Sequence, residues 1–318
     1  MPEWWIERGI GETRAVLVED GEIVEARVQL DGQVPTGAVI AAKLTSIGAN
    51  GRNAVARAVG GAEYLLPRGA GGVSEGTSVN IEVTREAIPG REPWKRPLAR
   101  VTEEEPRDAP PLAGRELPFP APRDDFAEVG WNDLLEEARC GIVRFAGGEL
   151  RISPTPAMTL IDVDGHLPAE ELAVAGAREA ARTIRRFDVG GSIGIDLPTV
   201  GSKAARQQAT AVIDAVLPRP FERTAVNGFG FVQIVRPRLR ASLVELAQDR
   251  ARFEGRLLLR RAAFEAPGGK RLVAHPAVVK TLEDHSGWVD ALARQIGGAV
   301  ELRSEPTLPM SAGYAESL

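Results

Sequence analysis

The chain has 318 residues, of which 43% are hydrophobic and 5% aromatic, and its formal net charge is -5. This composition excludes a largely disordered chain and predicts a core large enough for two or three domains. The acidic balance argues against a protein that coats nucleic acid through its bulk charge, so any contact with nucleic acid must depend on local basic clusters.

The sequence offers no set of soft metal ligands. Cys140 stands alone, so neither an intrachain disulfide nor a multi-cysteine zinc site is available. The three histidines, His166, His275 and His285, lie far apart in the sequence. The N-terminal residues contain no apolar leader, and no apolar run approaches the length of a membrane span. We therefore expect a cytoplasmic protein with no membrane partner and no zinc.

The first hundred residues predict strands. Residues 13–28 are expected to form a hairpin, because apolar residues alternate there and Asp20-Gly21 supplies a turn with positive φ. Short strand candidates follow over residues 38–102, broken at close intervals by glycine and asparagine, as is typical of a small barrel or sandwich. Basic residues outnumber acidic ones in this stretch, which indicates either a solvated barrel surface or a nucleic-acid-binding barrel of the OB type. These basic residues are Lys43, Arg52, Arg57, Arg68, Arg85, Arg91, Lys95, Arg96 and Arg100.

The pattern changes in the middle of the chain. Residues 103–125 are dense in proline and predict an extended linker, and residues 126–140 predict a short helix. Strands and helices then alternate, with strands over 148–153, 157–164, 192–198 and 230–237 and helices over 168–188 and 202–218. A long helix or helix pair over 239–266 and a strand-helix-strand unit complete the chain. The predicted fold class is therefore α/β, within a multidomain α+β chain.

Carboxylates end two successive strands of the alternating region. Asp162 and Asp164 close one strand, and Asp196 closes the next strand after a crossover helix. If the two strands are parallel neighbours, their ends meet at one edge of the sheet, and the period of two places Asp162 and Asp164 on the same side. Converging carboxylates repel one another unless a cation neutralises them, and oxygen ligands alone favour Mg²⁺, with Mn²⁺ as the alternative. Such an ion can activate water against a phosphate ester. The competing interpretation is that each aspartate only caps a turn or a helix.

Basic side chains are expected beside these carboxylates. Arg236, Arg238 and Arg240 alternate directly after an apolar strand, and Lys203 and Arg206 open the helix before it. Cations next to a metal-carboxylate site are what a phosphodiester substrate requires. Further arginines recur with helical spacing, and for them a solvated helix face is the competing interpretation. They are Arg178, Arg182, Arg185 and Arg186 in one helix and Arg252, Arg256 and Arg260 in another.

Several of these segments, in order and at matching distances, resemble the ribonuclease E/G family over most of the chain. The segments that carry the resemblance are ETRAVLVEDGEIVEARV, ISPTPAMTLIDVDG, AREAARTIRRFDVGGSIGIDL, GFGFVQIVRPRLRASL and the C-terminal VAHPAVVKTL, VELRSEPTL and GYAES. The resemblance implies a Mg²⁺-dependent endoribonuclease that cuts single-stranded RNA and leaves 5′-phosphate products. Asp162 and Asp196 match the family's metal-binding aspartates. Asp164 stands where the family usually has asparagine, and it either ligates the metal or alters the geometry.

The resemblance also implies a division into domains. An RNase H-like part, reduced where the family senses the RNA 5′ end, would comprise residues 1–37 and 126–157. An OB-type barrel over 38–102 would be inserted in it, followed by the proline-rich linker over 103–125. A DNase I-like catalytic domain would occupy residues 158–250 and a small C-terminal α/β domain residues 251–318. On the barrel, contacts with RNA are expected from Lys43, Tyr64, Arg85, Lys95 and Arg96.

The sequence departs from the family pattern at positions that bear on activity. The family's zinc-linking cysteine pair is absent, so we expect a monomer or weak dimer and no zinc-linked oligomer. Ala173 and Phe187 occupy positions usually held by asparagine and arginine, and Val55 stands near one of the family's barrel aromatics. The second hypothesis is therefore an RNA-binding protein on the same scaffold whose nuclease activity is weak or lost. A third is a metal-dependent phosphohydrolase that acts on a small substrate.

Overall fold

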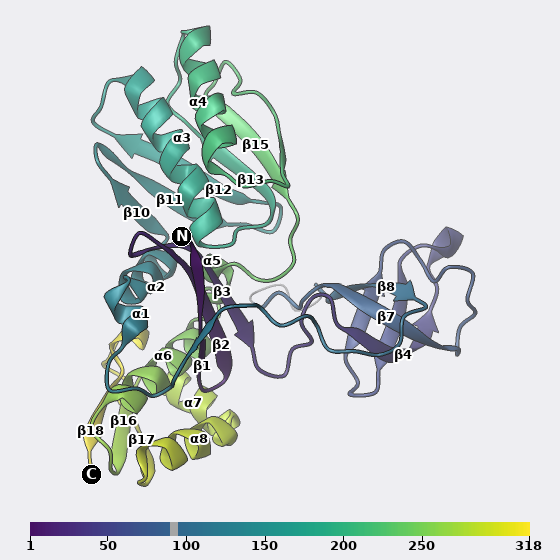
Figure 1. Ribbon diagram of the computed structural model, residues 1–318, viewed down its shortest axis with the longest axis vertical. Helices are drawn as coiled ribbons and strands as arrows, with labels where there is room; N and C mark the ends of the chain where they lie inside the picture. The colour runs from purple at the N-terminus through teal and green to yellow at the C-terminus, as the bar shows by residue number, and fades with distance from the viewer. Residues whose placement is uncertain (90–94) are drawn as a thin grey trace.

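The computed structural model describes residues 1–89 and 95–318, so Arg91 lies outside the described residues. The fold is mixed α/β, with three open sheets and one closed barrel (Figure 1). The first sheet has the strand order β3-β2-β1-β9. It begins with β1 (Glu3–Arg8), β2 (Glu12–Glu19) and β3 (Glu22–Leu30). The predicted hairpin is confirmed, because β2 pairs with β3 across Asp20 and Gly21, which both have positive φ.

The predicted small barrel is confirmed as a closed barrel of five strands, in the order β4-β5-β6-β8-β7. Its strands are β4 (Val39–Ser46), β5 (Ala54–Ala58), β6 (Glu63–Leu66), β7 (Ser78–Arg85) and β8 (Leu98–Thr102), with the short 3-10 turn η1 (Ala49–Gly51). Leu44, Leu66 and Ile81 fill its interior. Figure 1 shows the barrel set to one side of the three open sheets.

The proline-rich segment after the barrel is more ordered than an extended linker. Residues 115–117 form β9 (Arg115–Leu117), which pairs in parallel with β1 and completes the first sheet. The prediction of an unpaired linker was wrong there, because alternation over three residues is too short a signal to read from the sequence. The single helix expected next is split into α1 (Asp125–Glu128) and α2 (Trp131–Cys140), since Gly130 between them takes a φ of 92°.

The six-stranded sheet has the order β10-β11-β12-β13-β15-β14. Its strands are β10 (Ile142–Phe145), β11 (Gly148–Pro154), β12 (Thr159–Gly165), β13 (Gly191–Asp196), β14 (Glu222–Arg223) and β15 (Phe231–Arg236). Helices α3 (Ala169–Arg186) and α4 (Lys203–Val216) lie side by side over one face (Figure 1). The apolar residues that alternate along the strands, such as Ile161, Val163 and Ile195, pack into the same core as these helices.

The C-terminal region begins with a helix pair, the second of the two alternatives that the sequence left open for residues 239–266. Helix α5 (Leu243–Leu246) is followed by α6 (Arg250–Phe264) and a three-stranded sheet in the order β17-β16-β18. The remaining elements are β16 (Lys270–Ala274), α7 (Pro276–Asp284), α8 (Ser286–Ile296), β17 (Val300–Ser304), the 3-10 turn η2 (Met310–Ala312) and β18 (Tyr314–Ser317). Within the described ranges, no helix is both long and apolar enough to cross a membrane.

The arginine stripe of α6 is neither an exposed basic cluster nor, as the competing interpretation had it, a solvated helix face. Arg256 and Arg260 are buried, at 3% and 4% exposure, whereas Arg252 remains exposed. The buried pair forms ion pairs with Glu12 and Glu7 on the first sheet, at 2.5 and 2.9 Å. The stripe therefore joins the C-terminal helix to the N-terminal strands.

Candidate active site

Two of the predicted aspartates face each other on adjacent strands. β12 and β13 are parallel neighbours, and Asp162 is the register partner of Asp196. Adjacent strands lie about 4.8 Å apart, so the two carboxylates project side by side from the sheet. Asp164 is two residues farther along β12 and lies on the same face. The predicted neighbouring of Asp162 and Asp196 on parallel strands is confirmed, with Asp164 farther along the same face, and the role of all three as metal ligands stays a prediction.

The packing of α3 decides which face carries the acids. Ile161 and Val163 of β12 point into the helix-covered core, so Asp162 and Asp164 between and after them are exposed on the opposite, open face. Gly176 of α3 lets the helix approach closely, because a Cβ atom there would lie 2.3 Å from Val163 Cγ1. One face of the sheet thus packs into the core, and the other carries the exposed aspartates together with the partly exposed Leu160.

The open face is electrostatically unfavourable for an ionised Asp162. Partial burial, followed by the neighbouring charges of Asp164 and Asp196, raises the pKa of Asp162 above its usual range. Arg151, the register partner of Asp162 on β11, adds a cation to the same row, and it also forms an ion pair of 2.6 Å with Glu149. Arg151 was not predicted as a site residue, although its alternation with the buried Leu150 and Ile152 places it on this face.

The donor set suits a hard divalent cation. As the side chains lie, the described residues contain no group of three histidine, cysteine, aspartate or glutamate side chains gathered tightly enough to hold a metal ion. Mg²⁺, however, keeps several waters and binds proteins through one or two carboxylates. The adjacent carboxylates of Asp162 and Asp196 meet that requirement, and a cation between them would offset the charge repulsion that, after burial, raises the pKa of Asp162.

The predicted arginine cluster lies at the wrong end of the sheet. β15 is antiparallel to β13, so Arg236 pairs with Gly191 while Phe231 pairs with Asp196. Five residues of strand, about 16 Å, separate the two ends. Arg236 donates to the carbonyl oxygen of Val189 at 2.9 Å, so it holds the start of β13.

Its two neighbours are also engaged in the fold. Arg238 forms an ion pair with Glu245, and Arg240 forms one with Asp188 at 2.8 Å. The expectation that Arg236, Arg238 and Arg240 adjoin the aspartates was therefore wrong.

The basic residues of α4 follow the end of β13 that carries Asp196. The loop that follows Asp196 leads directly into α4, where Lys203 is exposed. Arg206 donates to the carbonyl oxygens of Val200 and Gly201, at 2.7 and 3.1 Å, and so fixes that loop. Lys203 is thus an exposed predicted cation directly after the loop that leaves Asp196, while Arg206 holds the backbone of that loop.

The barrel side chains that are expected to contact RNA differ in their exposure and in their bonds within the protein. Lys43 is exposed on β4. Arg96 forms an ion pair of 3.0 Å with Glu63, and Arg85 donates to the carbonyl oxygen of Arg96. Lys95 donates to the carbonyl oxygen of Pro156 at 3.0 Å, which ties the barrel to the loop before β12.

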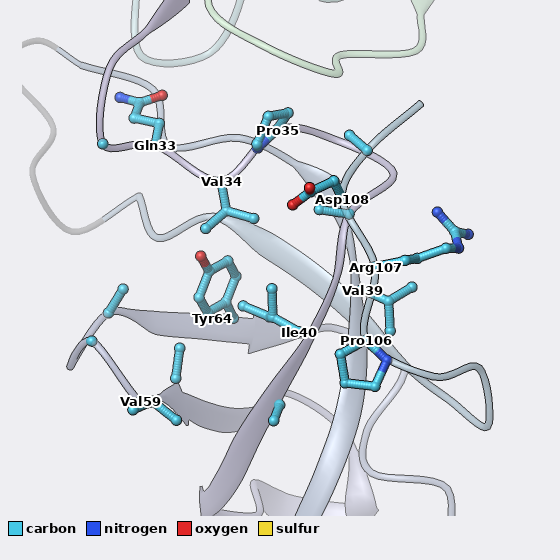
Figure 2. A pocket seen from close by; sticks show the side chains of 17 residues that line it. Gln33, Val34, Pro35, Val39, Ile40, Val59, Tyr64, Pro106, Arg107 and Asp108 are labelled. Atoms are coloured by element: carbon cyan, nitrogen blue, oxygen red, sulfur yellow. The ribbon is translucent and has the colours of Figure 1, made fainter. Parts of the chain in front are cut away.

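Tyr64 cannot present a free ring face for base stacking, because it is only 3% exposed within the barrel core. It lines a pocket of about 880 Å³ between the barrel and the segments that enter and leave it. Figure 2 shows its hydroxyl group pointing towards Val34, with Ile40 beside the ring. The charged residues of this lining are Arg107 and Asp108, and Arg107 already bonds to Glu104. Asp108 alone provides fewer ligands for a cation than the paired aspartates of the open sheet face. We therefore place the candidate active site on that face.

The sequence matches no protein-family model and no curated protein.

Proposed function

We propose that the chain is a Mg²⁺-dependent endoribonuclease that cuts single-stranded RNA in the cytoplasm. The observation that carries the proposal is the pairing of Asp162 with Asp196 on an open sheet face, with Asp164 beside them. Paired carboxylates without histidine or cysteine suit Mg²⁺, and Mn²⁺ would substitute for it. An open face, unlike an enclosed pocket, can accommodate a polymer that runs across it.

Each side chain of the candidate site would have a separate role in cleavage. Asp162 and Asp196 would hold the cation, and Asp164 would either ligate it or orient a bound water. When bound, the cation lowers the pKa of a water ligand and stabilises negative charge on the scissile phosphate. Lys203 and Arg151 would neutralise the RNA backbone on either side of the carboxylates. In-line attack by water on phosphorus would break its bond to the 3′-oxygen, so that one product would carry a 3′-hydroxyl and the other a 5′-phosphate.

The resemblance to the ribonuclease E/G family supports the same proposal. On that basis the barrel is an OB-type RNA-binding insertion, residues 158–250 form a DNase I-like catalytic domain, and the four-stranded sheet belongs to an RNase H-like part. The contact of Lys95 with the loop before β12 supports this arrangement, since it holds the barrel against the start of the strand that carries Asp162. No zinc and no zinc-linked oligomer would be involved, so the protein would act as a monomer or weak dimer.

The proposal is tested by cleavage of an AU-rich single-stranded oligonucleotide. Wild-type protein should cut it with Mg²⁺ and not with EDTA. Asp196→Asn should cut at least ~100-fold more slowly, because loss of one charged ligand weakens cation binding by several kcal/mol. Asp290→Asn is the matched control, since Asp290 is an exposed aspartate of α8. Equal rates for Asp196→Asn and Asp290→Asn would contradict the site assignment.

A second function has an observation in its favour. Ala173 and Phe187, which stand where the family has asparagine and arginine, are buried at 1% and 0% exposure in the core beneath the open face. Polar support for the carboxylates from these two positions is therefore absent, which fits an RNA-binding protein that has lost cleavage. Tight RNA binding together with no Mg²⁺-dependent products across varied sequences would favour this alternative.

A further inference from the structure

An aromatic side chain stands exposed beside the carboxylates. Phe229 is 82% exposed, whereas the buried Phe126, Phe187 and Phe221 are at most 5% exposed. It lies in the turn that leads into β15, two residues before Phe231, the register partner of Asp196. Two residues of chain and one strand spacing place its Cα within about 12 Å of that of Asp196. Sequence reasoning did not single it out.

The turn holds Phe229 in place with several hydrogen bonds. Asn227 Oδ1 accepts from the backbone N–H groups of Phe229 and Phe231, at 2.9 and 3.1 Å. The hydroxyl of Thr199, three residues after Asp196, donates to the carbonyl oxygen of Phe229 at 3.0 Å. The N–H of Leu197 donates to the carbonyl oxygen of Gly230 at 3.2 Å. The turn is thus bonded directly to the chain that leaves Asp196.

Gly230 completes this rigid turn. Its φ is 93°, and a Cβ atom would lie 2.1 Å from the carbonyl oxygen of Leu197. The turn therefore packs against the loop after β13 with no room for a side chain at this position. The backbone is fixed on both sides of Phe229, and the ring is the part left in solvent.

The surroundings of Phe229 match the needs of single-stranded nucleic acid. The loop that bonds to its carbonyl oxygen runs from Asp196 to the exposed Lys203 within seven residues. Farther down the open face, Phe231 and Leu160 cover the backbone of Gly194 and extend the apolar surface. The exposed aromatic ring thus stands on a turn bonded to the loop that joins a carboxylate to a cation. Non-specific binding of single strands combines charge on the backbone with aromatic platforms for the bases.

We infer that Phe229 is a stacking platform for a nucleobase of single-stranded RNA, next to the phosphate held at Asp162 and Asp196. The inference rests on the proposed function, because the carboxylates define where the scissile phosphate lies. The backbone of the turn is already fixed, so base stacking orders only the side-chain torsions of the ring. Every base has a π-face, so the platform selects single-stranded over duplex RNA more than it selects a sequence.

Base stacking is measured in the Asp196→Asn background, which retains the RNA intact in the presence of Mg²⁺. The probe is a single-stranded RNA carrying the fluorescent base 2-aminopurine at one position at a time. We expect quenching at one position, lost in Phe229→Ala and retained in Phe229→Trp. The affinity should fall about tenfold in Phe229→Ala. Tyr314→Ala, which removes an exposed aromatic side chain from the C-terminal sheet, should change neither quenching nor affinity.

The outcomes separate this inference from the proposed function. Unchanged affinity and quenching in Phe229→Ala would overturn the platform, even if wild-type protein cuts RNA. Quenching that depends on Phe229, found in a protein whose wild-type form never cuts RNA, would support the platform and overturn the nuclease. Phe229→Trp tests whether substitution at this position unfolds the turn. Quenching that is retained in Phe229→Trp requires a folded turn.

Discussion

At the residue scale, the three aspartates do not have equal positions. Asp162 and Asp196 are register partners, whereas β13 ends at Asp196, so Asp164 extends beyond it and pairs instead with Glu149 of β11. We predict that Asp164→Asn keeps cleavage within about tenfold of wild type, because it removes one repelling charge and leaves the paired ligands in place. The cleavage rate of Asp162→Asn should fall at least ~100-fold.

Initial cleavage rates at saturating and limiting Mg²⁺ measure both variants, and Asp290→Asn again provides the control. Equal losses in Asp164→Asn and Asp162→Asn would show that Asp164 is a full ligand. That result would contradict the lesser role of Asp164 that its place beyond the end of β13 predicts.

The aspartates could be predicted from the sequence, but their cationic neighbours could not. The period of two and a helix crossover between apolar strands are local patterns, and they correctly placed Asp162 beside Asp196. The position of Arg236 depends on the direction of β15, which lies antiparallel to β13 after a long connection. No local pattern encodes that direction. Arg151 and Phe229 were missed because their roles arise only from which strand or loop lies next to Asp162 and Asp196.

At the element scale, α3 sets the position of the strand that carries two of the aspartates. We predict that Gly176→Ala destabilises the protein by about 1–3 kcal/mol, because the new methyl group would overlap Val163. Without this overlap, alanine would be more favourable than glycine at a position inside a helix. Gly255→Ala is the matched control in α6, since its Cβ would meet Leu282 only at an ordinary 3.5 Å. That variant should be stabilised by up to about 1 kcal/mol.

Urea denaturation followed by circular dichroism gives both free energies of unfolding. Cleavage by Gly176→Ala should also slow, since displacement of Val163 moves Asp162 and Asp164 with it. A stabilised Gly176→Ala with full activity would mean that α3 has room to shift, and it would contradict a tight contact between this helix and Val163.

At the scale of the whole molecule, buried ion pairs join the N-terminal sheet to α6. Arg14 is fully buried and pairs with Glu7 and Glu12, at 2.6 and 2.7 Å, and these acids also bond to Arg260 and Arg256. Arg256 and Arg260 lie more than 240 residues away from these acids in the sequence. The spacing of the α6 arginines alone could therefore not distinguish this network from a solvated face.

Glu12 makes this network sensitive to acid. Burial opposes its ionisation, but the charges of Arg14 and Arg256 outweigh that effect and lower the pKa of Glu12. A carboxylate with a lowered pKa stabilises the fold at pH values above the ordinary pKa of glutamate. This contribution is lost as the pH falls through the lowered pKa of the folded state. We predict that Glu12→Gln costs about 3–5 kcal/mol at pH 7, because it leaves buried arginine charge without its partner.

The free energy of unfolding as a function of pH tests this prediction. The difference between wild type and Glu12→Gln should narrow as the pH falls below the usual carboxyl range, since protonated Glu12 resembles glutamine. Glu22→Gln, at an exposed position of β3, should behave like wild type throughout. A constant difference between wild type and Glu12→Gln from pH 7 to acid would contradict a stabilising role for this charge.

The most direct test of the candidate active site replaces one non-bridging oxygen of the scissile phosphate with sulfur. Mg²⁺ binds oxygen in preference to sulfur, whereas softer Mn²⁺ tolerates sulfur better. If a cation at Asp162 and Asp196 contacts this phosphate, sulfur in one of the two positions should slow cleavage about tenfold or more in Mg²⁺. Mn²⁺ should restore most of the rate. Cleavage insensitive to sulfur in both positions, or no cleavage of the unmodified RNA in either metal, would contradict a metal-dependent ribonuclease at this site.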